Sequence, residues 1–488
     1  MHRYVRRLLT HIRPRRVAVC LALAAGVLVF VVGETVFPYL TSNHDEAVYL
    51  QQAELLLDGQ LALDPPVSEV FRPWFFFAED GRLYPKYSPV TAGIFALGGL
   101  VGSFRLALAV VAAATTALTY AVVTEAFDRR TGVVAAALLV CSPLFVVQAS
   151  VFLSYVPALC LNLLFVWAYL RADRTGSRRW AALAGGAIGL AFFARPYTAV
   201  LFAAPFVAHA LWGLRPLERA TVVRHGVTAV LGVCGVLVAL GYNTVVTGDP
   251  LTFPYEAFAP KDGLGFGHHE IAGYEREYTV GLALEANARN LWVYATRWTP
   301  AGSLGTVLAA LGLAVAAVRA RWDIESLARA RWQPDARVLA IAGVAVTISL
   351  GNVYFWGTLN VLGELSDPSD GLISFVGPYY HVGLLLPTVA FGAVGFWAVV
   401  DRVRTRRAQL DGRLFRHALA GVALVTAVLA VAATASAVAG PLQDNYEVTR
   451  QYEQAYEPFE DHEFENALVF LPTPYGDWLN HPFQPLRN

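Results

Sequence analysis

Two short segments hold the residue types best suited to chemistry. The first reads HDEAVYL over residues 44–50, and the second reads YPKYSP over residues 84–89. A carboxylate such as Asp45 can act as a general base towards a hydroxyl group. A cation such as Lys86 can neutralise a departing phosphate. Lys86 is one of only two lysines in the chain, and its ammonium acts as a compact point charge. Together the segments predict a group-transfer site that combines an acid with a cation.

The elements that must position these residues are membrane helices. Of the 488 residues, 56% are hydrophobic and 15% are charged, whereas about a quarter are charged in a typical soluble domain. This composition excludes a soluble single domain, a disordered chain and a basic nucleic-acid binder. Because about 20 apolar residues span a bilayer as a helix, eleven spans are predicted. They cover residues 17–34, 105–124, 132–149, 156–171, 180–195, 196–213, 224–246, 300–319, 337–356, 377–400 and 417–440.

Charge placement predicts the orientation of these spans. The segments on one side of the membrane contain 26 of the 37 basic residues and nine of the 37 acidic residues. They are residues 1–16, 125–131, 171–179, 214–224, 319–337 and 401–416. Lys and Arg concentrate in cytoplasmic loops, so these segments are predicted to be cytoplasmic, with a net charge of +17 against −17 outside. Residues 88–103 are too short for a span and are predicted to form an interfacial or shallow re-entrant helix on the outer face.

The predicted fold class is an all-α polytopic membrane protein with outer loops and a short α/β tail. Its parts are a basic cytoplasmic N-terminus (1–16), a transmembrane domain (17–440), outer loops (35–104 and 247–299) and an outer tail (441–488). The tail begins with an acidic, Tyr-rich stretch that is expected to be helical or irregular. It continues with one predicted strand, Ala467 to Leu471. Since one strand forms no stable sheet alone, the tail either belongs to a larger cap or packs on the outer loops.

Two arginines are further candidates for binding an anion. Arg105 begins the second span at its outer end, against the positive-inside trend. Arg195 begins a junction broken by Pro196 between two spans. A charge near membrane depth is costly without a partner, so each could contact a phosphate. The alternative for Arg195 is an arginine that extends its charged end to the membrane surface without a chemical role.

The order of motifs along the chain resembles a known superfamily. An outer Asp45-Glu46 pair is followed by Lys86 before a proline, by a second span that begins at Arg105, and by a small-residue span that ends in Ser142-Pro143. Other matches are GGAIGLAFFARP at 185–196, Asn243 before Gly248-Asp249-Pro250, and Gly377-Pro378-Tyr379-Tyr380. Over residues 17 to 440 the chain resembles the GT-C superfamily of polyprenyl-phosphate-sugar-dependent glycosyltransferases. The most similar branch is the protein O-mannosyltransferase and aminoarabinose-transferase type.

The resemblance implies a membrane enzyme that moves a mannose-like hexose from a dolichyl- or polyprenyl-phosphate to an outer acceptor, with inversion. Asp45 would be the catalytic base, and Glu46 its acidic neighbour. Lys86 would contact the donor phosphate, with Arg105 and Arg195 as lesser candidates. The remaining candidates for substrate binding are His44, Tyr49, Tyr155 and His381. The expected partners are the lipid-linked sugar, a glycan, protein or lipid acceptor, and the bilayer, with no nucleic acid.

The chain also departs from the pattern of this superfamily. Lys86 is followed by one matched proline where members often have Lys-Pro-Pro. Ser154-Tyr155-Val156-Pro157 stands where many members carry Asp-x-Pro, and Tyr379 replaces the arginine of a late G-P-R-Y motif. Because the second acid is missing, we expect an enzyme without a metal or other cofactor. The adjacent His268 and His269 cannot easily point at one ion.

Two other functions remain open. A transporter or flippase for lipid-linked sugars would need polar or broken helices near the bilayer midplane, whereas the polar groups here collect at the outer ends of the spans. A non-catalytic homologue would explain the missing second acid and the altered late motif. Transfer from a defined dolichyl-phosphate sugar separates the three interpretations.

Overall fold

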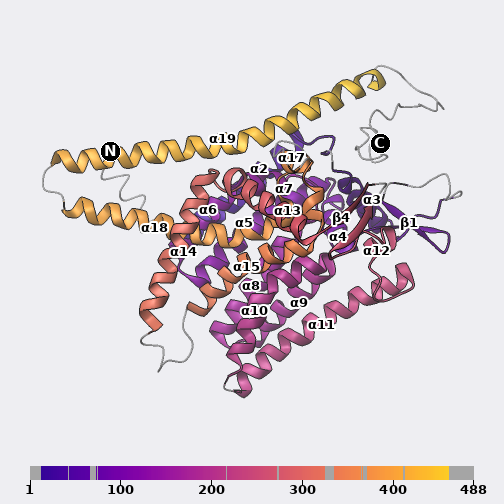
Figure 1. Cartoon of the computed structure of the whole chain (residues 1–488), viewed down its shortest axis with the longest axis horizontal. Helices are drawn as coiled ribbons and strands as arrows, with labels where there is room; N and C mark the ends of the chain where they lie inside the picture. The colour runs from indigo at the N-terminus through magenta and orange to yellow at the C-terminus, as the bar shows by residue number, and fades with distance from the viewer. Residues whose placement is uncertain are drawn as a thin grey trace.

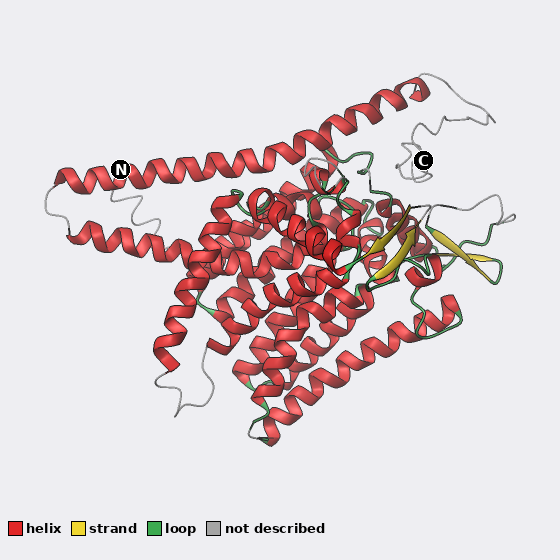
Figure 2. Cartoon of the chain, in the orientation of Figure 1, coloured by secondary structure: helices red, strands yellow, loops and turns green. Residues whose placement is uncertain are grey.

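The computed structural model describes residues 13–41, 43–65, 73, 75–215, 217–271, 274–324, 335–363, 365, 371–409 and 413–460. Figure 2 shows that this part of the chain is largely helical, with two small antiparallel strand pairs at one end. The predicted all-α polytopic fold is therefore confirmed. The predicted strand from Ala467 to Leu471 lies outside the described residues.

Among the described residues, seven helices are long and apolar enough to cross a membrane, or up to nine if each of two bent helix pairs is one span. By length alone, ten described helices have 17 or more residues: α2 (Pro14–Thr35), α5 (Phe104–Ala126), α8 (Tyr155–Thr175), α9 (Arg178–Ala194), α10 (Pro196–Gly213), α11 (Arg219–Thr247), α14 (Ser303–Ile324), α15 (Asp335–Gly351), α18 (Leu385–Gln409) and α19 (Arg413–Glu460). Every predicted span overlaps one of these helices or a bent pair, while the count of eleven stays a prediction.

Two spans are bent. Helices α6 (Arg129–Val140) and α7 (Pro143–Ala149) meet at 66°. Proline has no N–H to continue a helix, so Pro143 begins a new helix within the span predicted at 132–149. The second bend, of 103°, separates α14 from α13 (Val280–Val293) and the π-helix η1 (Tyr294–Trp298).

Short elements surround the ends of the long helices. They are α3 (Asp45–Leu57), α4 (Pro89–Gly99), α12 (Pro254–Phe258), α16 (Gly357–Asn360), α17 (Leu372–Phe375), the 3-10 helices η3 (Asn352–Tyr354) and η4 (Tyr379–Leu384), and strands β1 (Phe76–Glu79), β2 (Arg82–Pro85), β3 (Gly267–Ile271) and β4 (Tyr274–Tyr278). Strand β1 pairs with β2 and β3 with β4, both antiparallel. Helix α4 falls within the predicted interfacial segment 88–103 and ends at a turn in which Gly102 has a φ of 94°. Figure 1 shows α3, α4, α12 and both strand pairs gathered at one end of the bundle.

Small residues let the long helices approach closely. A Cβ atom added to Gly235 of α11 would lie 2.3 Å from the Cα atom of Gly189 of α9. One added to Gly312 of α14 would lie 1.8 Å from the carbonyl oxygen of Phe391 of α18. Neither position has room for a side chain, so these glycines set the packing of their helix pairs.

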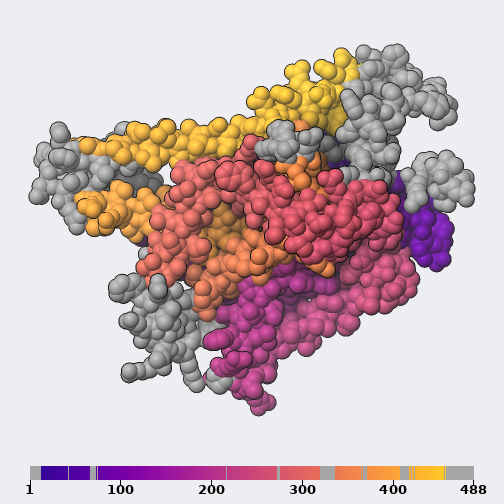
Figure 3. All heavy atoms as spheres, in the orientation of Figure 1, coloured from indigo at the N-terminus to yellow at the C-terminus, as the bar shows by residue number. Residues whose placement is uncertain are grey.

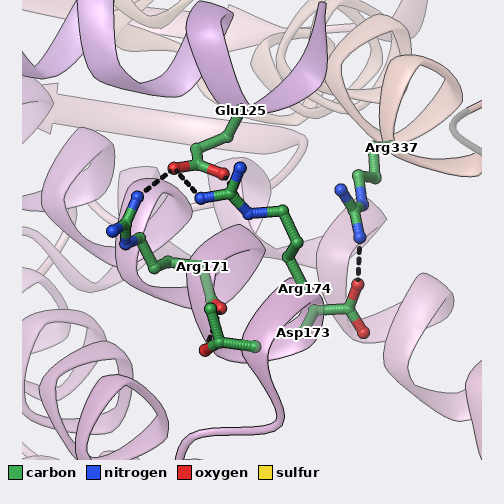
Figure 4. Close-up of polar contacts among 6 residues, drawn as sticks. Glu125, Arg171, Asp173, Arg174 and Arg337 are labelled. Carbon is green, nitrogen blue, oxygen red and sulfur yellow. Dashed lines mark hydrogen bonds and ion pairs between the residues drawn. The ribbon is translucent and has the colours of Figure 1, made fainter.

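Two buried carboxylates tie helix ends together within the segments that were predicted to be cytoplasmic (Figure 4). Glu125 of α5 lies 2.7 Å from Nη1 of Arg171 and 3.0 Å from Nε of Arg174, both on α8. Asp173 of α8 lies 2.9 Å from Nη2 of Arg337 on α15. Each carboxylate is only 4% exposed. Part of the arginine excess of these segments therefore holds the helices together.

Helix α19 borders the bundle along one edge, and its first half projects beyond the bundle beside α18 (Figures 1 and 3). Its second half is attached through side chains: Nδ2 of Asn445 donates a hydrogen bond to the carbonyl of Phe375 at 2.7 Å, and Tyr452 contacts Tyr39 edge to face. The helix continues without a break to Glu460. The acidic, Tyr-rich start of the tail is therefore helical.

Candidate active site

Asp45 and Lys86 form a partly buried ion pair. The Nζ atom of Lys86 lies 2.9 Å from Oδ1 of Asp45, and the two side chains are 4% and 19% exposed. Asp45 begins α3, where its N–H donates a hydrogen bond to Oδ1 of Asn43 at 3.1 Å. Lys86 directly follows β2. The sequence predicts that both residues lie on the outer face. The structure brings their side chains into direct contact.

Aromatic rings surround the Lys86 ammonium. Its Nζ atom lies 3.5 Å from the ring centroid of Phe75, 4.9 Å from Tyr87, 5.3 Å from Tyr255 and 5.4 Å from Phe258. The electron-rich face of an aromatic ring attracts a cation. These rings come from the two segments that are predicted to be outer loops, 35–104 and 247–299, so both segments hold the lysine beside Asp45.

Arg195 supplies a second cation near the same tyrosines. It ends α9 just before Pro196, and its Nη1 donates a hydrogen bond to Oγ of Ser154 at 2.5 Å. Its guanidinium lies 4.3 Å from the ring centroid of Tyr155. The Nε atom is buried and has no hydrogen-bond partner. No carboxylate of the described residues forms an ion pair with Arg195, so its charge is available to an anionic ligand.

Six tyrosines connect the two cations. They are Tyr49, Tyr87, Tyr155, Tyr255, Tyr379 and Tyr380. Tyr49 stacks on Tyr87 with ring centroids 4.5 Å apart, and Tyr155 contacts Tyr379 at 4.5 Å. Burial raises the pKa of Tyr49, Tyr87 and Tyr255 above the ordinary value for a phenol. These phenols therefore stay protonated near neutral pH and can donate hydrogen bonds to an anion or a sugar.

Glu46 is fully buried and contributes to the shape of the site. Its Oε1 accepts a hydrogen bond from the N–H of Thr41 at 2.8 Å and another from the Thr41 hydroxyl. Its Oε2 accepts a hydrogen bond from the N–H of Phe152 at 2.8 Å. Burial raises the pKa of Glu46, although these hydrogen bonds lower it in part. Glu46 therefore anchors the start of α3 to the segment between α7 and α8.

Arg105 is held by the end of the first span. Its Nη2 donates hydrogen bonds to the carbonyls of Phe37 at 2.8 Å and Pro38 at 3.2 Å. Its Nε lies 3.5 Å from Oε1 of Glu34. These contacts explain why an arginine begins α5 at this end. A phosphate contact by Arg105 stays a prediction.

The two candidate histidines lie in different surroundings. The ring of His44 packs edge to face on Phe75, with centroids 5.9 Å apart. His44 therefore borders the Lys86 cluster, that is, Lys86 and the rings around it (Phe75, Tyr87, Tyr255 and Phe258). His381 is fully buried, and its Nε2 lies 2.9 Å from Oδ1 of Asn287 on α13. The neighbouring Tyr380 contacts Tyr155 instead. The Gly377-Pro378-Tyr379-Tyr380 motif therefore brings Tyr379 and Tyr380 to Tyr155. The sequence interpretation did not name these two tyrosines as site residues.

Asp262 is a further acid near Lys86 that the sequence interpretation missed. It follows α12, is 5% exposed, and accepts hydrogen bonds from the hydroxyl of Tyr255 and the side chain of Trp356. Burial raises the pKa of Asp262 to about 6, although these hydrogen bonds and the charge of Lys86 lower it in part. No spacing signal marks this residue in its Gly-rich loop.

One group in the described part of the chain could hold a metal ion. Ligand atoms of His268, Glu270 and Glu275 lie within 4.8 Å of one another on β3 and β4. Glu270 also pairs with Lys261 at the surface. The adjacent His269 is buried, with Nε2 3.0 Å from the carbonyl of Gly265. The two histidines thus point to opposite faces of β3.

Comparison with protein families matches the central part of the chain. Residues 88–248 match the family described as dolichyl-phosphate-mannose-protein mannosyltransferase. This segment includes Ser154 and Arg195 and begins just after Lys86. Residues 467–488 match a family described as a domain of unknown function (DUF7846). No curated protein matches the chain.

Solved structures of two membrane proteins have a similar fold. The oligosaccharyltransferase of Archaeoglobus fulgidus in the apo form is 14% identical, with a TM-score of 0.50 over 86% of this chain and 56% of that one. The same enzyme with an inhibitory peptide and a dolichol-phosphate gives 0.51 at 14% identity, over 94% and 61%. ArnT from Cupriavidus metallidurans bound to undecaprenyl phosphate gives 0.54 at 12% identity, over 90% and 79%. The chain thus spans little more than half the length of the oligosaccharyltransferase.

These similarities confirm the predicted resemblance to the GT-C superfamily at the level of the fold. They also agree with a multi-pass membrane protein, as the apolar helices indicate.

Proposed function

We propose that this membrane protein of the GT-C fold is a glycosyltransferase that moves a hexose such as mannose from a dolichyl- or polyprenyl-phosphate to an acceptor on the outer face of the membrane. One observation carries the proposal: the Asp45–Lys86 pair and Arg195, which has no carboxylate partner among the described residues, belong to one tyrosine-lined cluster. The description of the matched family and the lipid phosphates bound to the similar proteins support it.

In this proposal Asp45 is the catalytic base. It accepts the proton of the acceptor hydroxyl while the acceptor oxygen attacks the anomeric carbon of the donor sugar. The bond between this carbon and the phosphate oxygen breaks, and the electron pair leaves with the lipid phosphate. A single displacement from the opposite face inverts the configuration of the anomeric carbon. Lys86 holds Asp45 at the reacting hydroxyl through its ion pair.

The leaving phosphate needs positive charge and hydrogen-bond donors. Arg195 offers a planar guanidinium that can donate to two phosphate oxygens, and Lys86 adds a point charge beside the base. Tyr155 contacts the guanidinium of Arg195, and Tyr49 stacks on Tyr87 beside Lys86; both are proposed to donate hydrogen bonds to the sugar or the phosphate. Since these protein groups can supply the required charge, we propose a reaction without a metal or other cofactor.

The apolar helices suit a lipid-linked donor. Exposed large side chains such as Val19, Leu23 and Val27 follow one side of α2, so the isoprenoid part can remain in the bilayer while the phosphate reaches the helix ends. The arginine-rich segments support a cytoplasmic N-terminus and an outer C-terminus. They therefore support the placement of Asp45 and Lys86 on the outer face.

The full chain purified in nanodiscs and supplied with radiolabelled dolichyl-phosphate mannose tests this proposal. Acceptor candidates are a Ser/Thr peptide, a lipid-linked glycan and membrane lipid extract. Wild-type protein should release dolichyl phosphate and label one acceptor class. Asp45→Asn should abolish the transfer, whereas Asp58→Asn, at an exposed position directly after the same helix, should keep it. Movement of the donor between leaflets of a vesicle without transfer would instead identify a flippase.

A further inference from the structure

A second carboxylate lies behind the Lys86 cluster. Asp262 belongs to the outer loop that follows α11, and its N–H donates a hydrogen bond to the carbonyl of Ala259 at 2.9 Å. Its side chain is almost fully buried. A buried carboxylate needs hydrogen-bond donors or a cation nearby to offset the loss of water. Asp262 has both kinds of partner.

The contacts of Asp262 connect it to the reacting pair. The hydroxyl of Tyr255 donates a hydrogen bond to Oδ2 of Asp262. The ring of Tyr255 lies 5.3 Å from Nζ of Lys86 and stacks on Tyr87 with centroids 6.1 Å apart. Lys86 in turn pairs with Asp45. One continuous series of contacts therefore joins Asp262 to the proposed base.

We propose that Asp262 is a positioning residue for the transfer reaction, because it holds the ring of Tyr255 against Lys86 and so fixes the ion pair of Lys86 with Asp45. The inference rests on the proposed function. A hydrogen bond from a phenol to a carboxylate is stronger than one between neutral groups. It also shifts electron density from the phenol oxygen into the ring, which strengthens the attraction of that ring for the lysine ammonium.

The charge of Asp262 matters for this role. The groups that face it are Lys86 after β2, Tyr255 of α12, His269 of β3 and the uncharged indole of Trp356. Burial raises the pKa of its carboxyl to about 6. The carboxylate accepts its strongest hydrogen bonds only when ionised. Its positioning effect should therefore grow as the pH rises through about 6.

Transfer kinetics from dolichyl-phosphate mannose between pH 5 and 8 test the inference. Asp262→Asn should lower kcat about tenfold at pH 7.5, with a much smaller change in KM, and should remove the rise in kcat near pH 6. Tyr255→Phe should lower kcat to a similar extent, and the double variant should be no slower than either single variant. The matched control is Asp249→Asn, at an exposed position of the same loop. His269→Gln should keep the pH-dependent rise, because Asp262 rather than the histidine produces it.

Lysine labelling gives a readout that does not depend on transfer. The chain has only two lysines, Lys86 and the exposed Lys261. In folded protein, acetic anhydride should modify Lys261 rapidly and Lys86 slowly, as followed by peptide mass spectrometry. Asp262→Asn and Tyr255→Phe should increase the rate at Lys86 about tenfold and leave the rate at Lys261 unchanged.

The two readouts separate two kinds of failure. If the wild-type protein transfers no sugar, the proposed function fails, and faster labelling of Lys86 in Asp262→Asn still supports the contact between Asp262, Tyr255 and Lys86. If transfer occurs but Asp262→Asn keeps both the wild-type pH profile and the wild-type labelling rate at Lys86, the inference is overturned. It is also overturned if the kinetic effects of Asp262→Asn and Tyr255→Phe simply multiply, because the two residues then act independently.

Discussion

Replacing Lys86 with methionine removes the ammonium but keeps a flexible side chain of similar length. The change leaves Asp45 without its ion-pair partner. Unit charges 2.9 Å apart attract each other by about 6 kcal/mol at an effective dielectric constant of about 20. Desolvation of both groups offsets most of this attraction, and loss of one partner of a buried pair costs about 3–5 kcal/mol. Because Asp45 keeps 19% of its side-chain surface exposed, we expect Lys86→Met to cost about 3 kcal/mol of unfolding free energy, at the lower end of this range.

Unfolding in mixed micelles measures this cost. A denaturing detergent is titrated against the purified protein, and tryptophan fluorescence reports the folded fraction. Lys261→Met is the matched control, because Lys261 is the other lysine and its partner Glu270 is also at the surface. An exposed ion pair contributes little, so the control should unfold at the wild-type detergent fraction. Transfer by Lys86→Met should fall at least about 100-fold, as expected for losing a preorganised charge at a reacting centre.

A double-mutant cycle can refute this reasoning. If Lys86 and Asp45 stabilise each other, Asp45→Asn combined with Lys86→Met should cost less than the sum of the two single changes. Strict additivity would show that the pair contributes no coupling free energy. Equal unfolding curves for Lys86→Met and Lys261→Met would contradict the burial argument directly.

Four further predictions follow from other contacts. Arg195→Lys keeps the positive charge but loses the planar guanidinium that can donate hydrogen bonds to two phosphate oxygens. The KM for dolichyl-phosphate mannose should therefore rise about tenfold in initial-rate assays. Burial raises the pKa of Glu46 above 4.5 in the folded protein. Its contribution to stability is therefore present below about pH 4.5 and is lost as the pH rises through the higher folded pKa. Glu46→Gln should flatten this pH dependence of the unfolding free energy in titrations from pH 4 to 8. Gly235→Leu should separate α11 from α9, because a Cβ atom there already meets Gly189 at 2.3 Å, and the yield of monodisperse protein in gel filtration should fall. Asp173→Asn removes the carboxylate that pairs with the largely buried Arg224 and Arg337, whose side chains are 12% and 14% exposed, and should cost about 3 kcal/mol in the mixed-micelle assay.

The spans and the first half of the site could be predicted from the sequence. Long apolar runs specify helices in a membrane, and the arginine asymmetry predicts their orientation across it. Asp45 and Lys86 are therefore predicted to lie on one face of the membrane, although they are 41 positions apart in the chain. Their direct contact depends on the short β1–β2 pair that precedes Lys86, and the sequence interpretation did not include this pair.

The remainder of the site depends on packing between distant segments. Tyr379 and Tyr380 belong to a motif that was identified, yet their contact with Tyr155 arises from how η4 meets α8. Asp262 lies in a loop whose residue types indicate only irregular structure. Spans that are rich in Ala, Val and Leu fit together in many ways, so their patterns do not specify which loop covers the site. The bend at Pro143 was likewise not predicted, although the Ser-Pro motif was identified.

The hydrogen bond from the N–H of Phe152 to Glu46 joins residues 106 positions apart, and this separation has a consequence for biogenesis. During synthesis α3 leaves the ribosome well before Phe152. Until Phe152 arrives, the Glu46 carboxylate has to be hydrated at the membrane surface, and α3 has no fixed attachment to the segment before α8. The tyrosines of η4 arrive still later. Assembly of the site is therefore ordered in time, and a chain arrested before Phe152 presents α3 with the Glu46 carboxylate still hydrated and without its attachment to the segment before α8.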